Sequence, residues 1–242
     1  MNSRKAGKLA ALVISGAAAA LYAAGAMVPV KSSSEILARA AGKHTVSKPA
    51  VVIDPGHGGA DGGCVSVNGV AEKGINLAVG LSERDILTVL GYEVTMTRDR
   101  DVSIFDEGTK GLAKQKQSDM KNRLALINQC KGVAISIHQN QFTDSRYSGG
   151  QMFYSRRNKG GERLAGVMQE RFCSLLQPEN EREIKAVDDE LYLLDQSDTA
   201  AVMIECGFLS NGEEAKKLES EGYQKQVALT IASGVVEYGV EA

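Results

Sequence analysis

The sequence carries little excess charge of either sign. Its 28 Lys and Arg residues and 30 Asp and Glu residues leave a formal net charge of −2 at pH 7. Tryptophan is absent and aromatic residues make up only 5%, so no basic stripe is interleaved with aromatic side chains. Proteins that bind nucleic acid concentrate positive charge to neutralise phosphates. We therefore do not expect DNA or RNA as a partner.

Cysteine and histidine are both scarce. The four cysteines form no CxxC pair and have no metal-ligand spacing, which excludes a cysteine-based zinc site. Two disulfides would be feasible in an oxidising compartment, but the scattered spacing favours free thiols in small apolar spaces. The chain has only three histidines and no HExxH sequence, which excludes the helix-borne arrangement of many metalloproteases.

A long uncharged run occurs only at the N-terminus. Arg4, Lys5 and Lys8 precede an almost uncharged stretch from 9 to 30. This pattern is typical of a secretion signal, and Ala24-Gly25-Ala26 has the form of a cleavage site. About 20 apolar residues can also span a bilayer, so a signal-anchor that attaches residues 9–30 to the membrane is an alternative. A buried core helix is the weaker alternative. With the basic residues inside, the remainder of the chain is exported.

The composition then divides the chain into three parts. Residues 31–48 are polar, contain His44 and show no sustained pattern, as is typical of a linker. We therefore predict a signal peptide or signal-anchor over 1–30, a linker over 31–48 and one folded domain over 49–242.

Within the domain, strand-like and helix-like segments alternate, which predicts an α/β fold. The expected strands cover 50–54, 92–98, 133–138, 151–155, 191–194 and 201–205, and the expected helices cover 76–90, 118–129, 162–176 and 223–238. This alternation indicates a mainly parallel sheet covered by helices on both faces. A Rossmann-type dinucleotide binder is excluded, since no GxGxxG follows the first strand.

Three local features refine this prediction. Residues 99–117 form one long irregular connection, and such loops usually serve function, so we expect it at the rim of a site. Ser118 is a candidate N-cap for the second helix. Ser210 followed by Glu213 has the form of a capping box that opens another short helix.

Two of the three histidines follow apolar strands. His57 lies in Asp54-Pro55-Gly56-His57-Gly58-Gly59, and His138 ends Ile135-Ser136-Ile137-His138. Ligands of α/β sheets bind at the carboxyl ends of strands, so the two imidazoles converge if these strands are neighbours. Two imidazoles and one carboxylate would leave an open fourth position, as in a catalytic zinc site. The structural alternatives are a solvent-facing histidine in a glycine turn and a satisfied core histidine.

An acidic residue closes a further apolar strand. Glu205 follows Ala201-Val202-Met203-Ile204, where burial of an unpaired carboxylate would be costly. Glu205 therefore lies either at the functional edge of the sheet or in a structural salt bridge.

Taken together, these motifs resemble those of the zinc-dependent N-acetylmuramoyl-L-alanine amidases, over about residues 50–240. The resemblance rests on DPGHGG, on Ala71-Glu72-Lys73-Gly74-Ile75-Asn76, on SIHxN and on IECGFLSN. It implies that His57, Glu72 and His138 hold Zn²⁺ and that Glu205 is the catalytic acid. It also implies a mixed, roughly six-stranded sheet in one domain, and peptidoglycan as the substrate. By the same resemblance we expect Asn140 and Arg123 to contact the substrate.

A narrower resemblance is to the germination-specific amidases that modify spore cortex. It rests on residues 106–111 in the long loop and on residues 148–154 after His138. It implies cleavage between N-acetylmuramic acid and L-alanine on the way to muramic-δ-lactam, at an extracytoplasmic location between the spore membranes. The alternatives are a catalytically silent wall-binding or scaffold protein and another zinc peptidase or deacetylase. Signal cleavage, an activating partner protein and the oligomeric state are left open.

Overall fold

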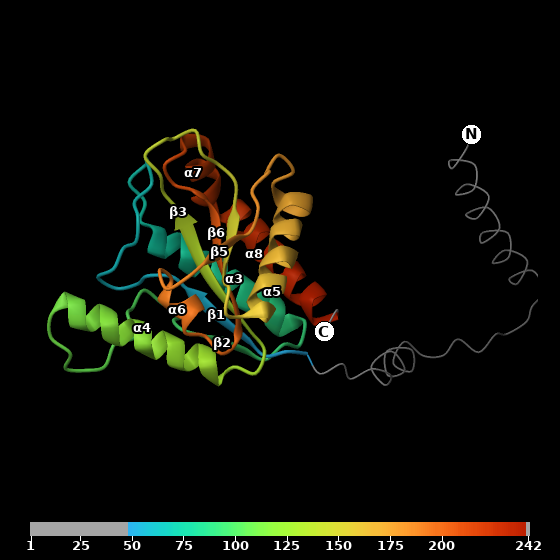
Figure 1. The fold of residues 1–242 in the computed structure, drawn as a ribbon. Helices are drawn as coiled ribbons and strands as arrows, with labels where there is room; N and C mark the ends of the chain where they lie inside the picture. Colours follow the sequence, from blue (N-terminus) through green and yellow to red (C-terminus); the bar gives the residue numbers. More distant parts are fainter. Residues whose placement is uncertain (1–47, 241–242) are drawn as a thin grey trace, which may run out of the picture. The chain divides into compact units, whose positions relative to one another are not determined.

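A computed structural model describes residues 48–240, as shown in Figure 1. The predictions for residues 1–30 and for most of the linker lie outside the described residues. No helix in the described part of the chain is long and apolar enough to cross a membrane. The four cysteines are free, in agreement with the expectation from their spacing.

A six-stranded mixed sheet forms the centre of the domain, in the order β2-β1-β3-β6-β4-β5. Its strands are β1 Val51–Pro55, β2 Val94–Met96, β3 Val133–Asn140, β4 Gln151–Ser155, β5 Lys185–Val187 and β6 Ala200–Phe208. All neighbours are parallel except β4 and β6. The predicted α/β class, with a mixed and mainly parallel sheet, is confirmed.

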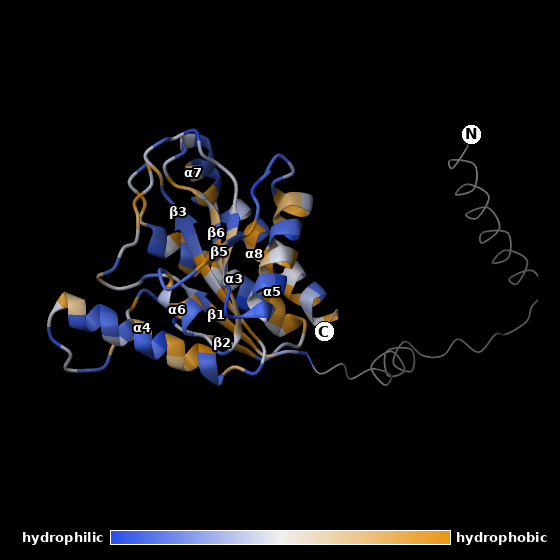
Figure 2. Ribbon diagram, in the orientation of Figure 1, coloured by the Kyte–Doolittle hydropathy of each residue, from blue (hydrophilic) through white to orange (hydrophobic). Residues whose placement is uncertain are grey.

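Helices cover both faces of this sheet. They are α3 Glu72–Val89, α4 Leu112–Gln129, α5 Lys159–Arg171, α6 Tyr192–Asp195, α7 Gly212–Leu218 and α8 Glu221–Val240, with a short π-helix η1 at Phe172–Leu176. Helices α3, α5 and α8 pack on one face, whereas α4 and α6 lie on the other. Helix α4, on the second face, is largely hydrophilic (Figure 2).

Side-chain alternation along the strands assigns residues to these faces. Ile135 and Ile137 of β3 belong to the larger core under α3 and α8, while Ala134 belongs to the smaller core under α4. His138 is four residues after Ala134, so the alternation places its side chain on the same side, facing α4 and α6. The central strands β1, β3 and β6 are buried on both faces at their apolar positions, which explains their continuous apolar runs.

One expected strand is wrong. Residues 191–194 do not form a strand but lie in and just before the single-turn helix α6. A run of four apolar residues has no periodicity that separates a strand from a helical turn. The sixth strand is instead β5, whose three residues begin with the exposed Lys185 and are too few for an alternation to be visible.

The expected start of α4 and the expected cap of α7 also differ. Helix α4 begins at Leu112, six residues before Ser118, whose hydroxyl donates instead to Asp106. The first turns of α4 are polar and exposed, so their sequence lacks the apolar period that marks a helix. Helix α7 exists as expected, but Asn211 is its cap and accepts from the backbone N–H of Glu213 and Glu214. Ser210 accepts from the N–H of Phe142.

Candidate metal and catalytic site

A glycine turn after β1 carries His57. The backbone of His57 has φ +64, the one positive φ among non-glycine residues of the described chain. Only glycine fits at position 56, because a Cβ there would lie 2.2 Å from the imidazole of His138. The turn therefore brings the two rings close, with centroids 4.9 Å apart. The expected convergence of the two histidines is confirmed, since β1 and β3 are neighbouring parallel strands.

Glu72 supplies the carboxylate between the two histidines. It is the first residue of α3, and its Oε2 lies 3.2 Å from Nε2 of His57 while its Oε1 lies 3.0 Å from Nδ1 of His138. Burial alone would raise the pKa of Glu72, but the two histidines hold it well below its usual range. The candidate ligand atoms of the three residues lie within 4.8 Å of one another. Two imidazole nitrogens and a carboxylate fit the ligand preference of catalytic zinc.

Buried polar groups fix the orientation of Glu72. The side-chain amide of Asn76 donates to Glu72 Oε1 at 3.0 Å, and the N–H of Gln139 donates to the same oxygen at 3.0 Å. The N–H of Cys64 donates to Oε2 at 2.9 Å. Gln139 also donates through Nε2 to Asn76 Oδ1, so these groups form one network. Such partners of a ligand usually tune metal affinity.

His57 has a partner of its own. Asp61 Oδ1 lies 2.9 Å from His57 Nδ1 and also accepts from the N–H of Gly63. Partial burial raises the pKa of Asp61, but a hydrogen bond from Lys116 and the charge of His57 lower it to about 2. Because an ionised Asp61 can only accept, Nδ1 of His57 carries the proton and Nε2 is left free to bind a metal.

The long loop after β2 packs on the same turn. Ser103 donates through its hydroxyl to Gly58 O at 2.7 Å, and Asp101 accepts from the N–H of Gly59 at 2.8 Å. Asp101 also pairs with Lys73. This places the loop beside His57, as expected for a segment at the rim of the site.

Glu205 lies one strand away from His138. The two residues are register partners on the parallel strands β3 and β6. Glu205 Oε2 is shielded from solvent and has no hydrogen-bond partner within the described chain, so the structural salt bridge is not formed. Burial raises the pKa of Glu205 to about 7, against the lowering effect of His138. A carboxylate with this pKa suits proton transfer near neutral pH.

Beside the histidines, on the side of the sheet that α4 and α6 cover, lies a cavity of about 180 Å³. Its apolar wall includes Met120 of α4, Leu191 and Leu193 around α6, and Met203 of β6. His57 and His138 border the same space. A ligand in this cavity would therefore contact both histidines.

Comparison with a protein family decides the assignment. Residues 51–237 match the family described as N-acetylmuramoyl-L-alanine amidase, and this span includes all the residues of the site above. The chain belongs to this amidase family. Its members hydrolyse amide bonds, and zinc dependence is general among them.

Individual amidases are similar over most of their length. The germination-specific N-acetylmuramoyl-L-alanine amidase of Bacillus subtilis is 36% identical over 192 residues, which cover 79% of this chain and 80% of the relative. The CwlD amidase from Clostridioides difficile, solved in complex with the GerS lipoprotein, is 34% identical with a TM-score of 0.77, over 80% of this chain and 100% of that one. The catalytic domain of CwlV from Bacillus (Paenibacillus) polymyxa is 31% identical with a TM-score of 0.65, over 78% of this chain and 97% of that one.

Arg123 is buried in the amidase framework next to the His57 turn. Its guanidinium is buried and donates to Asp119 at 2.7 Å, to Asp54 at 2.6 Å and to His57 O at 2.7 Å. Burial would raise the pKa of Asp54, but Arg123 and two hydroxyls lower it. Arg123 also lines the cavity beside His57 and His138, and its expected contact with the substrate stays a prediction. Its position ties α4 to the His57 turn.

Asn140 ends β3 and is partly exposed. Its backbone oxygen accepts from the N–H of Leu209 at 2.8 Å, which ties the end of β3 to the segment that follows β6. A contact between the Asn140 side chain and the substrate stays a prediction.

The sequence reasoning did not find Asp61, Asn76 or Cys64. Asp61 lies four residues after His57, the one local spacing that could have pointed to it. Asn76 lies four residues after Glu72, one helical turn away, but only the location of Glu72 at a helix start gives that spacing a meaning.

Proposed function

We propose that this amidase binds Zn²⁺ through His57, Glu72 and His138, and that Glu205 moves the proton during cleavage of the bond between N-acetylmuramic acid and L-alanine. One observation carries the proposal. The three ligand side chains, which come from the turn after β1, from α3 and from β3, converge beside the carboxyl group of Glu205. One oxygen of this carboxyl group is shielded from solvent and has no hydrogen-bond partner within residues 48–240. A site of this composition supports hydrolysis rather than structural metal binding, because it leaves a coordination position open.

The residues of the site divide the chemistry between them. When bound, Zn²⁺ supplies Lewis-acid activation of water and of the substrate carbonyl. Glu205 accepts the proton of the attacking water and delivers it to the leaving amine of L-alanine. Asp61 holds the proton of His57 on Nδ1, and Asn76 holds Glu72 in the orientation that faces both histidines. The apolar wall of the cavity excludes bulk water from one side of this centre.

The alternative functions lack comparable support. A silent wall-binding protein has no need for a carboxyl group whose pKa is raised to about 7 by burial beside a ligand set. A zinc peptidase or deacetylase is not favoured by any feature of the site beyond those shared with an amidase.

We further propose that the substrate is spore-cortex peptidoglycan and that the domain acts outside the cytoplasmic membrane, exported by residues 1–30. The similarity to the germination-specific amidase of Bacillus subtilis supports this assignment. The lipoprotein bound to CwlD in the solved complex supports a protein partner for this chain as well.

Mass spectrometry of released muropeptides tests the proposal. Purified protein is incubated with cortex and with vegetative wall, each with added zinc and with chelator. We expect zinc-dependent loss of whole stem peptides from muramic acid, greater on cortex. Intact muropeptides in the presence of zinc and of candidate lipoproteins would refute the amidase assignment, and equal release from both walls would refute the cortex preference.

A further inference from the structure

Three aromatic side chains form a stack beside the site. The rings of Phe142 and Tyr147 meet edge to face with centroids 4.9 Å apart, and Tyr147 stacks on Phe208 at 6.0 Å and an interplanar angle of 28°. The guanidinium of Arg182 lies 4.5 Å from the centroid of Phe208 and 5.5 Å from that of Tyr147. Phe208 is buried, whereas Phe142 is 53% and Tyr147 45% exposed. The stack therefore presents two aromatic rings to solvent.

Hydrogen bonds between side chains and the backbone hold the stack in place. The N–H of Phe142 donates to the Ser210 hydroxyl, and the side-chain amide of Asn211 donates to Tyr147 O. Arg182 donates through Nε to Ser148 O at 2.7 Å. Rings that are ordered before a ligand arrives bind it with a smaller loss of conformational entropy.

The stack lies next to the proposed catalytic residues. Phe142 follows β3, the strand of His138, and Phe208 ends β6, the strand of Glu205. Arg182 also donates to the side chain of Gln151 at 3.3 Å, and Gln151 is the register partner of Glu205 on the antiparallel strand β4. A polymer bound at the metal site would therefore reach the stack.

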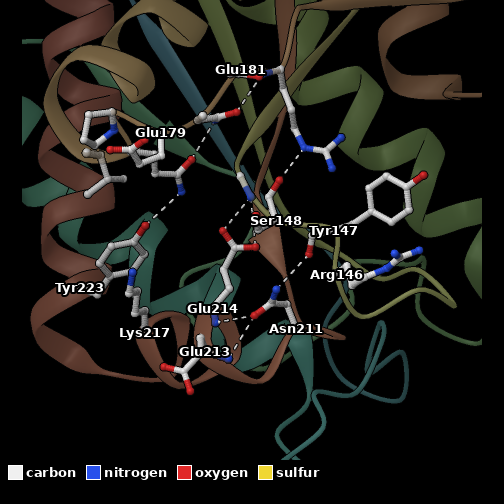
Figure 3. Close-up of a pocket in the computed structure, with 16 residues that line it drawn as sticks. Arg146, Tyr147, Ser148, Glu179, Glu181, Asn211, Glu213, Glu214, Lys217 and Tyr223 are labelled. Carbon is white, nitrogen blue, oxygen red and sulfur yellow. Dashed lines mark hydrogen bonds between the residues drawn. The ribbon is translucent and has the colours of Figure 1, made fainter.

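A large polar pocket adjoins the stack, with a volume of about 670 Å³ (Figure 3). Tyr147 and Arg146 stand at one side of it and Tyr223 at the other. The side chains of Ser148, Glu179 and Lys217 also line it, and none of these three forms a hydrogen bond or ion pair within residues 48–240. The pocket thus offers a hydroxyl, a carboxylate and an ammonium group that are free to bind a ligand.

We propose that Phe142 and Tyr147, together with this pocket, bind a sugar ring of the glycan strand next to the muramic acid that is cleaved. A hexosamine has an apolar C–H face, which suits an exposed aromatic ring, and a rim of hydroxyl and amide groups, which suits the pocket. The proposal rests on the proposed function, because peptidoglycan continues as sugar on either side of each scissile amide.

A protein partner is the competing occupant of this surface. Gln141 donates to Val65 O and so joins the exposed Val65 to the loop of Phe142. However, the centres of protein interfaces are depleted in charged residues, whereas Glu179, Lys217 and Arg146 line the pocket here. The charge content favours a carbohydrate.

Kinetics on two substrates of different length test the glycan subsite. The full-length, zinc-loaded protein is assayed on long glycan strands that carry stem peptides and on a single N-acetylmuramoyl peptide. Tyr147→Ala and Phe142→Ala are compared with Tyr147→Phe, which keeps the stacked ring. Leu229→Ala on α8 serves as the control, because Leu229 is 59% exposed and lies outside the pocket.

For long strands, we expect each alanine variant to raise KM about tenfold, the scale of one lost ring contact, with kcat within about twofold. KM for the single-sugar substrate should be unchanged. Tyr147→Phe and Leu229→Ala should match the wild type, and all variants should retain zinc. Unchanged KM for the strands in both alanine variants would overturn the subsite, as would an equal rise for the two substrates. If the alanine variants lost binding to a protein partner while KM for the strands stayed normal, the surface would belong to that partner, which would also overturn the subsite.

Binding of a tetrasaccharide of N-acetylglucosamine, measured by calorimetry, separates the subsite from the proposed function. If the wild type binds this probe and Tyr147→Ala does not, the subsite is supported even if no amide is cleaved. If the wild type cleaves the amide and Tyr147→Ala binds the tetrasaccharide as tightly as the wild type does, the proposed function stands and the subsite is rejected.

Discussion

Replacing Glu205 with glutamine separates proton transfer from metal binding. The two side chains are nearly isosteric, and Glu205 is not one of the three proposed ligands. We therefore expect Glu205→Gln to keep its fold and its zinc. General acid–base groups contribute about 10²- to 10⁴-fold, so turnover should fall by that order. Glu205 must be ionised to accept a proton, and a bound dication favours the ionised form, so the acid limit of wild-type turnover should lie below the pKa of about 7 that Glu205 has in the metal-free fold.

The same substitution has a predictable effect on stability. The pKa of Glu205 is raised by burial from 4.5 to about 7 in the metal-free fold. A raised carboxyl pKa means that the folded state holds a proton which the unfolded chain releases, so stability is lost as pH rises through this interval. The interval corresponds to on the order of 3 kcal/mol. Metal-free wild type should therefore lose about that much free energy of unfolding between about pH 4.5 and pH 8, relative to Glu205→Gln.

The assay combines three measurements on the same preparations. Urea denaturation of metal-free protein at about pH 5 and about pH 8, on either side of the raised pKa, gives the stability difference. Bound zinc is measured by mass spectrometry, and turnover is measured on muropeptides. A structural salt bridge predicts the opposite pattern, with lost stability and little change in rate per folded molecule. A zinc-loaded Glu205→Gln variant with wild-type turnover would refute the catalytic role.

The other residues of the site and the N-terminal segment give four further predictions. His138→Ala should lose bound zinc and turnover together, and a full equivalent of zinc with normal turnover would contradict the ligand assignment. Asn76→Ala should weaken zinc affinity about 10- to 100-fold in a chelator competition. Asn128→Ala is the control and should leave this affinity unchanged, because Asn128 bonds to Gln196 and Asp198 and not to the ligand network. Arg123→Met removes the cation between two buried aspartates and should cost about 3–5 kcal/mol in urea denaturation, whereas a loss below about 1 kcal/mol would contradict the framework role. A reporter fused after Ala242 should be active outside the cytoplasm, and activity only inside would contradict export by residues 1–30.

The sequence alone determined the sheet and the kind of chemistry at its edge. Apolar runs that alternate with amphipathic segments predicted five of the strands and the long helices, because burial imposes these periods directly on the sequence. His57 just after β1, His138 near the end of β3 and Glu205 after the apolar run of β6 stood out, because such side chains are costly inside a sheet. The single-turn helix α6 and the three-residue β5 were missed, since each is shorter than the period that would reveal it.

Only the tertiary structure decided which of these groups meet and what each one does. Glu72 lies 66 residues from His138 in sequence, yet their side chains are 3.0 Å apart because α3 begins at the edge where β1 and β3 end. Nothing in the sequence indicated that Arg123 pairs with Asp54 and Asp119, which belong to β1 and to its own helix. Distance and burial between segments remote in the chain depend on how helices pack on the sheet. No local pattern of residues encodes that packing.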